Sequence, residues 1–294
     1  PMFISTSSSI VMRNIDRVIV LPTLGTESLG HYSLTVIALT FLLYLPDSIT
    51  YVLYPQFLRR YAEGDSRPES IRGLVERVLK GMTVFVPLLC GLTYLFARDA
   101  VTLLLPKYIP GVTALRVLCF GAVGIALSNL ASVVLMTLGR QMLLVPAALL
   151  SIVVGASLDL VAVKLGYGIT GVAWTTFFTF LVNGSIMLGF VQRGFGGDGR
   201  AIAAGLARAL APLVIAIALA ASLEKFLPWM EPRDLVSHLV RLALATVIFL
   251  PAYIVLTWPF TRGMSLRQLV GELSIPVIGP MLRRFGVVDR GASS

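Results

Sequence analysis

Charged residues lie along one side of the first apolar segment, residues 2–24. Arg13, Asp16 and Arg17 fall within an arc of about 120° on a helical wheel. A charge at mid-bilayer costs about 3 kcal/mol on insertion scales, so three charges on one face are not expected to face lipid. Arginine holds phosphate through paired hydrogen bonds and stays charged in low-dielectric surroundings. We therefore expect Arg13 and Arg17 to bind substrate in a hydrated, cationic cavity. The alternative is a buried Arg13–Asp16 ion pair that only fixes helix packing.

Polar residues of the second segment, 31–56, also share one arc of about 120°. They are Ser33, Thr40, Tyr44, Asp47, Ser48, Tyr51 and Tyr54. Tyrosine rings can stack on sugars, and hydroxyl and carboxylate groups can hydrogen-bond to them. We expect Tyr44 and Tyr51 to bind substrate on this face, although Tyr51 and Tyr54 also suit an interfacial aromatic belt. Pro46 predicts a kink.

Two later segments carry polar residues at helical spacing. Ser151, Gly155 and Asp159 follow one another at intervals of four in segment 141–163, a pattern that favours close helix contact over ligand binding. In segment 168–191, interhelical hydrogen bonds are expected from Thr176, Thr179 and Asn183. The candidate sites for a coupling ion or proton are Asp16, Asp47 and Asp159.

Motifs for other chemistry are missing from the sequence. It has no GxxxxGK[ST] phosphate loop, no nucleophile elbow and no cluster of metal-ligand residues. We therefore expect neither an enzyme nor a bound cofactor or metal. Cys90 and Cys119 are interpreted as small buried apolar residues, and His31 and His238 as isolated interfacial residues.

The composition is that of an integral membrane protein. Of 294 residues, 56% are hydrophobic and 13% are charged, against about 25% charged in soluble domains. Eight apolar runs are long enough to cross a bilayer: 2–24, 31–56, 81–98, 113–138, 141–163, 168–191, 201–223 and 235–258. They do not alternate as barrel strands do. The expected fold is an all-α, polytopic bundle of about eight transmembrane helices.

The net charge of +9 reflects topology. The loops on one side of the eight runs hold 14 Lys and Arg residues, and those on the other side hold five. The positive-inside rule makes the first side, and both ends of the chain, cytoplasmic. This distribution argues against a nucleic-acid partner and for the lipid bilayer as the surroundings.

The connecting segments suggest the domain organisation. Residues 1–191 form a six-helix half-bundle, 192–200 a Gly-rich cytoplasmic linker, and 201–258 two additional transmembrane helices. Loop 57–80 contains an amphipathic pattern from Ile71 to Leu79, preceded by a possible Ser66–Glu69 capping box. We expect that helix to lie at the cytoplasmic surface. Residues 259–294 are expected to form a weaker amphipathic cytoplasmic tail.

Short motifs follow one another in a familiar order. They are Arg13-Asn-Ile-Asp16-Arg17, Leu24-Gly25, Leu29-Gly30-His31-Tyr32-Ser33 and Leu53-Tyr54-Pro55, with further stretches at 108–111, 115–118 and 168–174. This progression resembles the polysaccharide and lipid-linked oligosaccharide flippases of the multidrug/oligosaccharidyl-lipid/polysaccharide exporter superfamily. The similarity covers residues 1 to about 191.

The resemblance implies two six-helix bundles facing each other, of which this chain supplies the carboxy-terminal one. An amino-terminal half-bundle is then missing from the chain. The implied activity is alternating-access transport of a lipid-linked saccharide across the bacterial cytoplasmic membrane. That activity serves cell-surface polysaccharide biosynthesis, such as that of lipopolysaccharide or exopolysaccharide. A polysaccharide polymerase is a further candidate partner.

Other functions remain open at this point. A flippase for a lipid-linked peptidoglycan precursor fits two helices after the bundle. Cation-coupled multidrug efflux would need a cavity of net negative charge, which Arg13 and Arg17 oppose. A membrane scaffold without transport activity would bury its polar faces against each other and leave no cavity.

Overall fold

The computed structural model describes the backbone of residues 2–226 and 235–261, and the side chains of residues 14–226 and 236–260. Every element in these ranges is helical. In chain order they are α1 (Met2–Glu63), α2 (Glu69–Leu104), η1 (Pro106–Gly111), α3 (Val112–Leu118), α4 (Gly121–Thr137), η2 (Gln141–Leu143), α5 (Leu144–Lys164), α6 (Gly168–Gly194), α7 (Gly199–Phe226) and α8 (Leu235–Thr261). The expected all-α bundle is confirmed.

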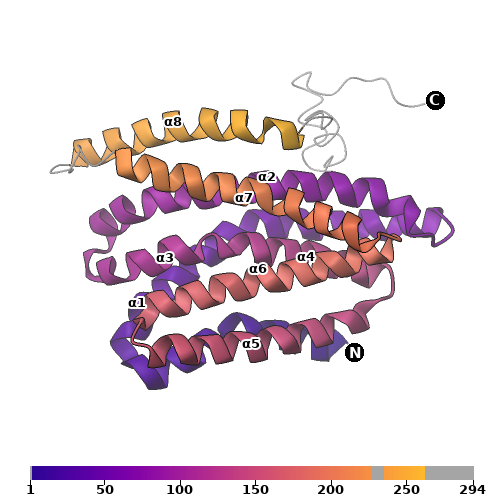
Figure 1. The fold of residues 1–294 in the computed structure, drawn as a ribbon, viewed down its shortest axis with the longest axis horizontal. Helices are drawn as coiled ribbons and strands as arrows, with labels where there is room; N and C mark the ends of the chain where they lie inside the picture. Colours follow the sequence, from indigo (N-terminus) through magenta and orange to yellow (C-terminus); the bar gives the residue numbers. More distant parts are fainter. Residues whose placement is uncertain (1, 227–234, 262–294) are drawn as a thin grey trace.

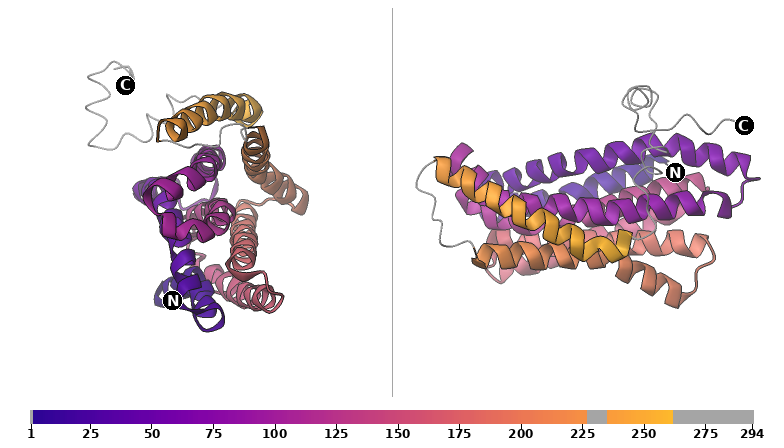
Figure 2. Two further views of the ribbon diagram at one scale, coloured as in Figure 1. Left: turned by 90° about the vertical axis from the view of Figure 1, so that its left-hand side faces the viewer. Right: turned by 90° about the horizontal axis from the view of Figure 1, so that it is seen from above.

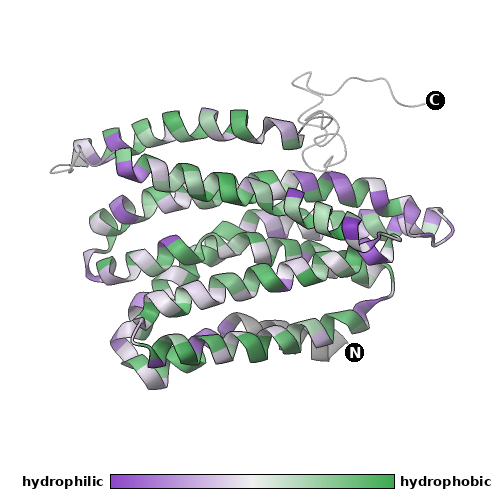
Figure 3. Ribbon diagram, viewed as in Figure 1, coloured by the Kyte–Doolittle hydropathy of each residue, from purple (hydrophilic) through white to green (hydrophobic). Residues whose placement is uncertain are grey.

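The long helices lie side by side along one axis, with α8 and α5 at opposite edges (Figures 1 and 2). Six of the described helices are long and apolar enough to cross a membrane, and α3 with α4 makes a seventh span if counted together. Hydrophobic residues fill the middle of the helices, and hydrophilic residues gather towards their ends (Figure 3). The chain is therefore a multi-pass membrane protein.

The helix α1 contains two of the eight expected runs, because the chain reverses within it. Gly25 has φ 84° and ψ 175°, which is not helical and is open almost only to glycine. Residues 16 and 32 would lie about 24 Å apart in a straight helix, yet their side chains are hydrogen-bonded. Gly25 thus joins two antiparallel arms, 2–24 and 26–63. At Pro46 the backbone dihedrals stay helical.

The run 113–138 was expected to be one helix and is instead bent by 49° between α3 and α4. At the joint, Cys119 donates its thiol proton to the carbonyl of Arg116 at 3.1 Å. The amides of Ala122 and Val123 bond three residues back instead of four. A side chain that competes for a backbone carbonyl is a known cause of a helix kink.

The amphipathic stretch of loop 57–80 is a helix, and its apolar face packs into the protein core. It forms the first turns of α2, and Ile71, Leu74 and Val78 are buried in the main core cluster. The expectation of a Ser66–Glu69 capping box is wrong. Ser66 has φ 57° and lies outside the helix, which starts at Glu69 after Pro68 without a side-chain cap.

Helices α5 and α6 pack through the two polar stripes found in the sequence. Gly155 faces Thr179, and a Cβ at Gly155 would lie 3.1 Å from the Thr179 methyl carbon. One step along, Ser151 donates a 3.0 Å hydrogen bond to the Asn183 side chain. The expected close contact is confirmed, with intervals of four residues on both antiparallel helices.

The last two helices pack against α2. Tyr253 of α8 donates its hydroxyl to the carbonyl of Val84 at 2.8 Å, and the Phe249 ring lies against Gly91, where a Cβ would overlap it. The side chain of Gln192, at the end of α6, packs on Gly205 of α7. Most of the expected amphipathic tail, 259–294, lies outside the described residues.

Candidate functional site

The two arms of α1 are joined by a buried hydrogen bond between candidate residues. Tyr32 donates its hydroxyl proton to Asp16 Oδ2 at 2.5 Å, and the other carboxylate oxygen accepts from the backbone amide of Arg17 at 2.9 Å. Asp16 is 2% exposed and Tyr32 is 0% exposed. A buried charge needs such partners, since an unpaired one costs several kcal/mol.

A second buried carboxylate lies close by. Asp159 of α5 is 1% exposed and accepts a hydrogen bond from the Thr175 hydroxyl of α6. Asp159 is near enough to Asp16 for the two carboxylates to interact electrostatically, and Tyr32 lies within the influence of both. The structure therefore gathers two of the three candidate ion or proton sites around one tyrosine. Like charges in such proximity favour uptake of a proton or cation.

Arg17 lies half-buried beside this cluster. One of its terminal nitrogens donates to the Asn14 side-chain oxygen at 3.4 Å. Its buried Nε has no acceptor among the described residues. Arg13 lies on the same arm of α1, but its side chain is outside the described part. The expected Arg13–Asp16 pair is therefore neither supported nor opposed.

Part of the polar face of the second arm is exposed, while Ser33, Asp47 and Tyr54 are half-buried. Tyr44 is 75% exposed and Tyr51 is 74% exposed. They belong to a stripe of exposed positions spaced by three and four residues: Ile37, Phe41, Tyr44, Ser48, Tyr51, Pro55 and Leu58. Ser48 donates to the Tyr44 carbonyl at 2.7 Å within the helix. The tyrosines thus face away from the buried Asp16–Asp159 cluster rather than into the same interior.

The third candidate carboxylate has its own partner. Asp47 is half-buried and accepts a 2.5 Å hydrogen bond from the Asn129 side chain of α4. On the neighbouring residue of α4, Ser128 accepts a 2.8 Å hydrogen bond from Asn183 of α6. Asn183 therefore links α4, α5 and α6, which confirms the interhelical bonding expected for it.

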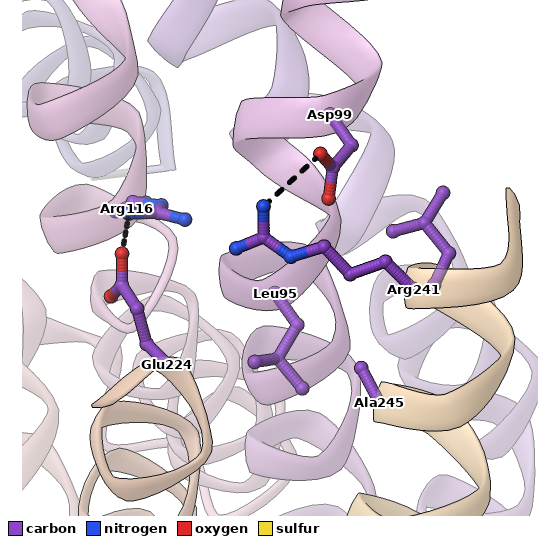
Figure 4. Close-up of a pocket in the computed structure, with 7 residues that line it drawn as sticks. Leu95, Asp99, Arg116, Glu224, Arg241 and Ala245 are labelled. Carbon is purple, nitrogen blue, oxygen red and sulfur yellow. Dashed lines mark hydrogen bonds and ion pairs between the residues drawn. The ribbon is translucent and has the colours of Figure 1, made fainter. Parts of the chain in front are cut away.

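A further charge cluster lies near the C-terminal end of α2, and the sequence interpretation missed it. Asp99 is within 2.9 Å of His238 Nδ1 and 3.7 Å of an Arg241 terminal nitrogen. Beside it, Arg116 forms an ion pair with Glu224 (Figure 4). The sequence does hold a signal for this cluster. His238 and Arg241 lie three residues apart in one apolar span, and Asp99 lies at the end of another.

This cluster holds helices together and leaves no room for a substrate. The cavity between its residues measures about 10 Å³, which is about the space one water needs. Tyr94 strengthens the pairing by donating to Glu224 at 2.5 Å. The two histidines are not isolated, contrary to expectation. His238 is buried against Asp99, and His31 lies edge-on to the Tyr108 ring at 5.9 Å.

The cysteines behave as expected. Cys90 donates its thiol to the Cys119 carbonyl at 3.1 Å, and both residues are buried where α2 meets the joint of α3 and α4. Comparison with known proteins adds no family to this description. No protein-family model matches the chain, and no curated protein matches its sequence.

Proposed function

We propose that the chain is one half of an alternating-access flippase that moves a lipid-linked oligosaccharide across the bacterial cytoplasmic membrane. The observation that carries the proposal is the outward face of α1 with Tyr44, Ser48 and Tyr51. Hydroxyl groups on a transmembrane helix usually face protein or water rather than lipid. This face therefore suits one wall of a hydrated path, completed by an opposing six-helix bundle.

Arg17 and the buried carboxylates, from which these tyrosines face away, supply a second set of candidate groups inside the half-bundle. Arg17 has a buried donor with no acceptor among the described side chains, and its guanidinium suits the pyrophosphate of a lipid-linked sugar. Asp16, which accepts the hydrogen bond from Tyr32, and Asp159 suit binding of a proton or cation. Because Tyr32 and Asp16 belong to different arms of α1, a change of charge at Asp16 would alter the contact between the arms. Alternating access needs such a link between ion binding and helix position.

The water-filled path can be tested by labelling. Single cysteines at positions 44, 48 and 51 should react with a water-soluble maleimide, since the two native cysteines are buried. Matched controls at Val153, Phe178 and Val247, also exposed but on other helices, should not react if they face lipid. Equal labelling of both sets would count against a path along α1.

The transported substrate needs a separate test. The protein should be assayed in its own membrane for flipping of a lipid-linked oligosaccharide, a lipid-linked peptidoglycan precursor and a lipophilic organic cation. Flipping of the oligosaccharide alone supports the proposal. Flipping of the peptide-bearing precursor favours a peptidoglycan role, and export of the cation alone would overturn both.

Orientation is part of the same proposal. Cysteines at positions 65 and 197 should resist an impermeant reagent added outside intact cells, and one at exposed Glu27 should react. The reverse pattern would place the ends of the chain outside.

A further inference from the structure

A large hollow lies at the end of the bundle where α6 joins α7. It has a volume of about 690 Å³ and is lined by the first turns of α2, the last turns of α6, the first half of α7 and the end of α8. This end, on the right in Figures 1 and 3, carries hydrophilic residues on α2 and α7. The sequence interpretation assigned it to the cytoplasmic side, and the proposed function did not use it.

The charged residues of the hollow are mainly basic. Arg72, Lys80 and Arg208 line it with one acid, Glu76. Glu76 is already paired, because its Oε1 lies 2.9 Å from Arg72 Nε. Neither Lys80 nor Arg208 is within ion-pair distance of a carboxylate in the described part of the chain. Two cations therefore face the hollow without a counter-charge from residues 14–226 or 236–260.

Helix lengths place these cations at the edge of the bilayer. The 36 residues of α2 span about 54 Å, well beyond a hydrocarbon core of about 30 Å. From Lys80 to the end of α2 at Leu104 is about 36 Å, so Lys80 lies at headgroup level. Arg208 lies about 13 Å along α7 from Gly199, and it faces the same hollow. A cation at that depth needs an anion to pair with, and the membrane lipids carry anionic groups at that level.

The floor of the hollow is apolar. Val75, Leu188 and Val191 are buried beneath it, and Phe195 and Phe260 line it at the α6 and α8 ends. A free inorganic anion gains nothing from such a floor. An acyl chain does, at about 0.8 kcal/mol for each buried methylene group.

We propose that this hollow binds an anionic membrane phospholipid, with its headgroup phosphate on Lys80 and Arg208 and an acyl chain on the apolar floor. Basic pockets between transmembrane helices on the cytoplasmic side are suited to such headgroups. The lipid would touch α2, α6, α7 and α8 at once and so help to hold the last two helices against the half-bundle.

The chain's own tail is the other possible occupant, but its charge does not fit. Residues 262–294 contain five arginines and two acidic residues. A basic tail would add positive charge to a basic hollow. An anion from the membrane is therefore the better charge complement.

The test measures the lipids that the purified full chain retains. The protein is exchanged into nanodiscs with equal amounts of phosphatidylglycerol and phosphatidylcholine of identical acyl chains, and retained lipid is counted by native mass spectrometry. The wild type should retain phosphatidylglycerol preferentially. The variant Lys80→Gln with Arg208→Gln should lose that preference, by about fivefold per cation removed.

The control variant, Arg98→Gln with Lys107→Gln, makes the same charge change at exposed positions near the opposite end of α2. It should keep the preference. A second variant, Ala204→Trp, fills the hollow at an exposed position without changing charge, and it should also lose the retained lipid. Equal loss in the control, no preference in the wild type, or displacement of the lipid by millimolar inorganic phosphate would each overturn the proposal.

Discussion

The hydroxyl group of Tyr32 donates a 2.5 Å hydrogen bond to the carboxylate of Asp16, across the reversal of the chain at Gly25. The two residues are sixteen apart in sequence and fully packed. This bond closes the hairpin of α1 and fixes the position of the buried Asp16 carboxylate. Replacement of either partner should therefore affect the folding of the hairpin as well as its chemistry.

Tyr32→Phe should destabilise the protein by about 1–3 kcal/mol, because it leaves a buried carboxylate without its side-chain donor. Asp16→Asn combined with Tyr32→Phe should be less destabilising than the sum of the single changes, with a coupling energy of roughly 0.5–3 kcal/mol. Unfolding of the purified protein in detergent measures both quantities. Tyr51→Phe, at an exposed position, is the control and should change stability by less than about 0.5 kcal/mol.

Gly25→Ala tests the reversal itself. Alanine is disfavoured at φ 84°, ψ 175°, and we expect a loss of about 1–3 kcal/mol. Gly30 provides a matched control on the same helix. A Cβ added at either glycine would meet no neighbouring atom within 4 Å, and only Gly25 has positive φ.

Gly30→Ala should leave the stability of the protein unchanged or raise it slightly, because alanine favours a helix more than glycine does. Thermal unfolding in detergent compares the two variants directly. Equal effects at both positions would show that the chain does not depend on a glycine conformation at residue 25.

How far the sequence predicts this structure depends on whether a feature is local. Helical spacing predicted the stripe of Ser151, Gly155 and Asp159 and its close contact with another helix, because the face of a helix follows from its own residues. Spacing does not say which helix a face will meet. Hence only the structure shows which residue contacts Asp159. The same holds for the contact of Tyr32 with Asp16 and for the exposure of Tyr44.

The misinterpreted elements have the same cause. The stretch from Ile71 to Val78 has an amphipathic pattern, and that pattern does not tell whether its apolar face meets a protein core or a membrane. His238 looked isolated because its partner, Asp99, is 139 residues away. The bend after Cys119 depends on a thiol bonded to a backbone carbonyl, which hydropathy does not reveal.

Asp99→Asn should weaken the attachment of α8. It removes the acid that lies beside His238 and Arg241, and loss of one partner from a buried charge pair costs roughly 3–5 kcal/mol. Limited proteolysis of the purified protein should then cleave earlier between α7 and α8. Asp198→Asn, at an exposed linker position, should leave the cleavage rate unchanged. Unaltered proteolysis of the Asp99 variant would contradict the conclusion that this cluster holds α8 against α2.

The central claim is that Arg17 and the tyrosine face of α1 handle an anionic, sugar-bearing substrate. The most direct measurement is export of a lipid-linked oligosaccharide, normalised to membrane abundance, in variants of the protein in its native membrane. Arg17→Gln should abolish export at nearly normal abundance, because glutamine lacks the charge and the planar fork. Tyr44→Ala with Tyr51→Ala should also reduce export, while Phe178→Ala, exposed on α6, should not. Normal export by the Arg17 variant, or a loss that only follows its abundance, would contradict the account.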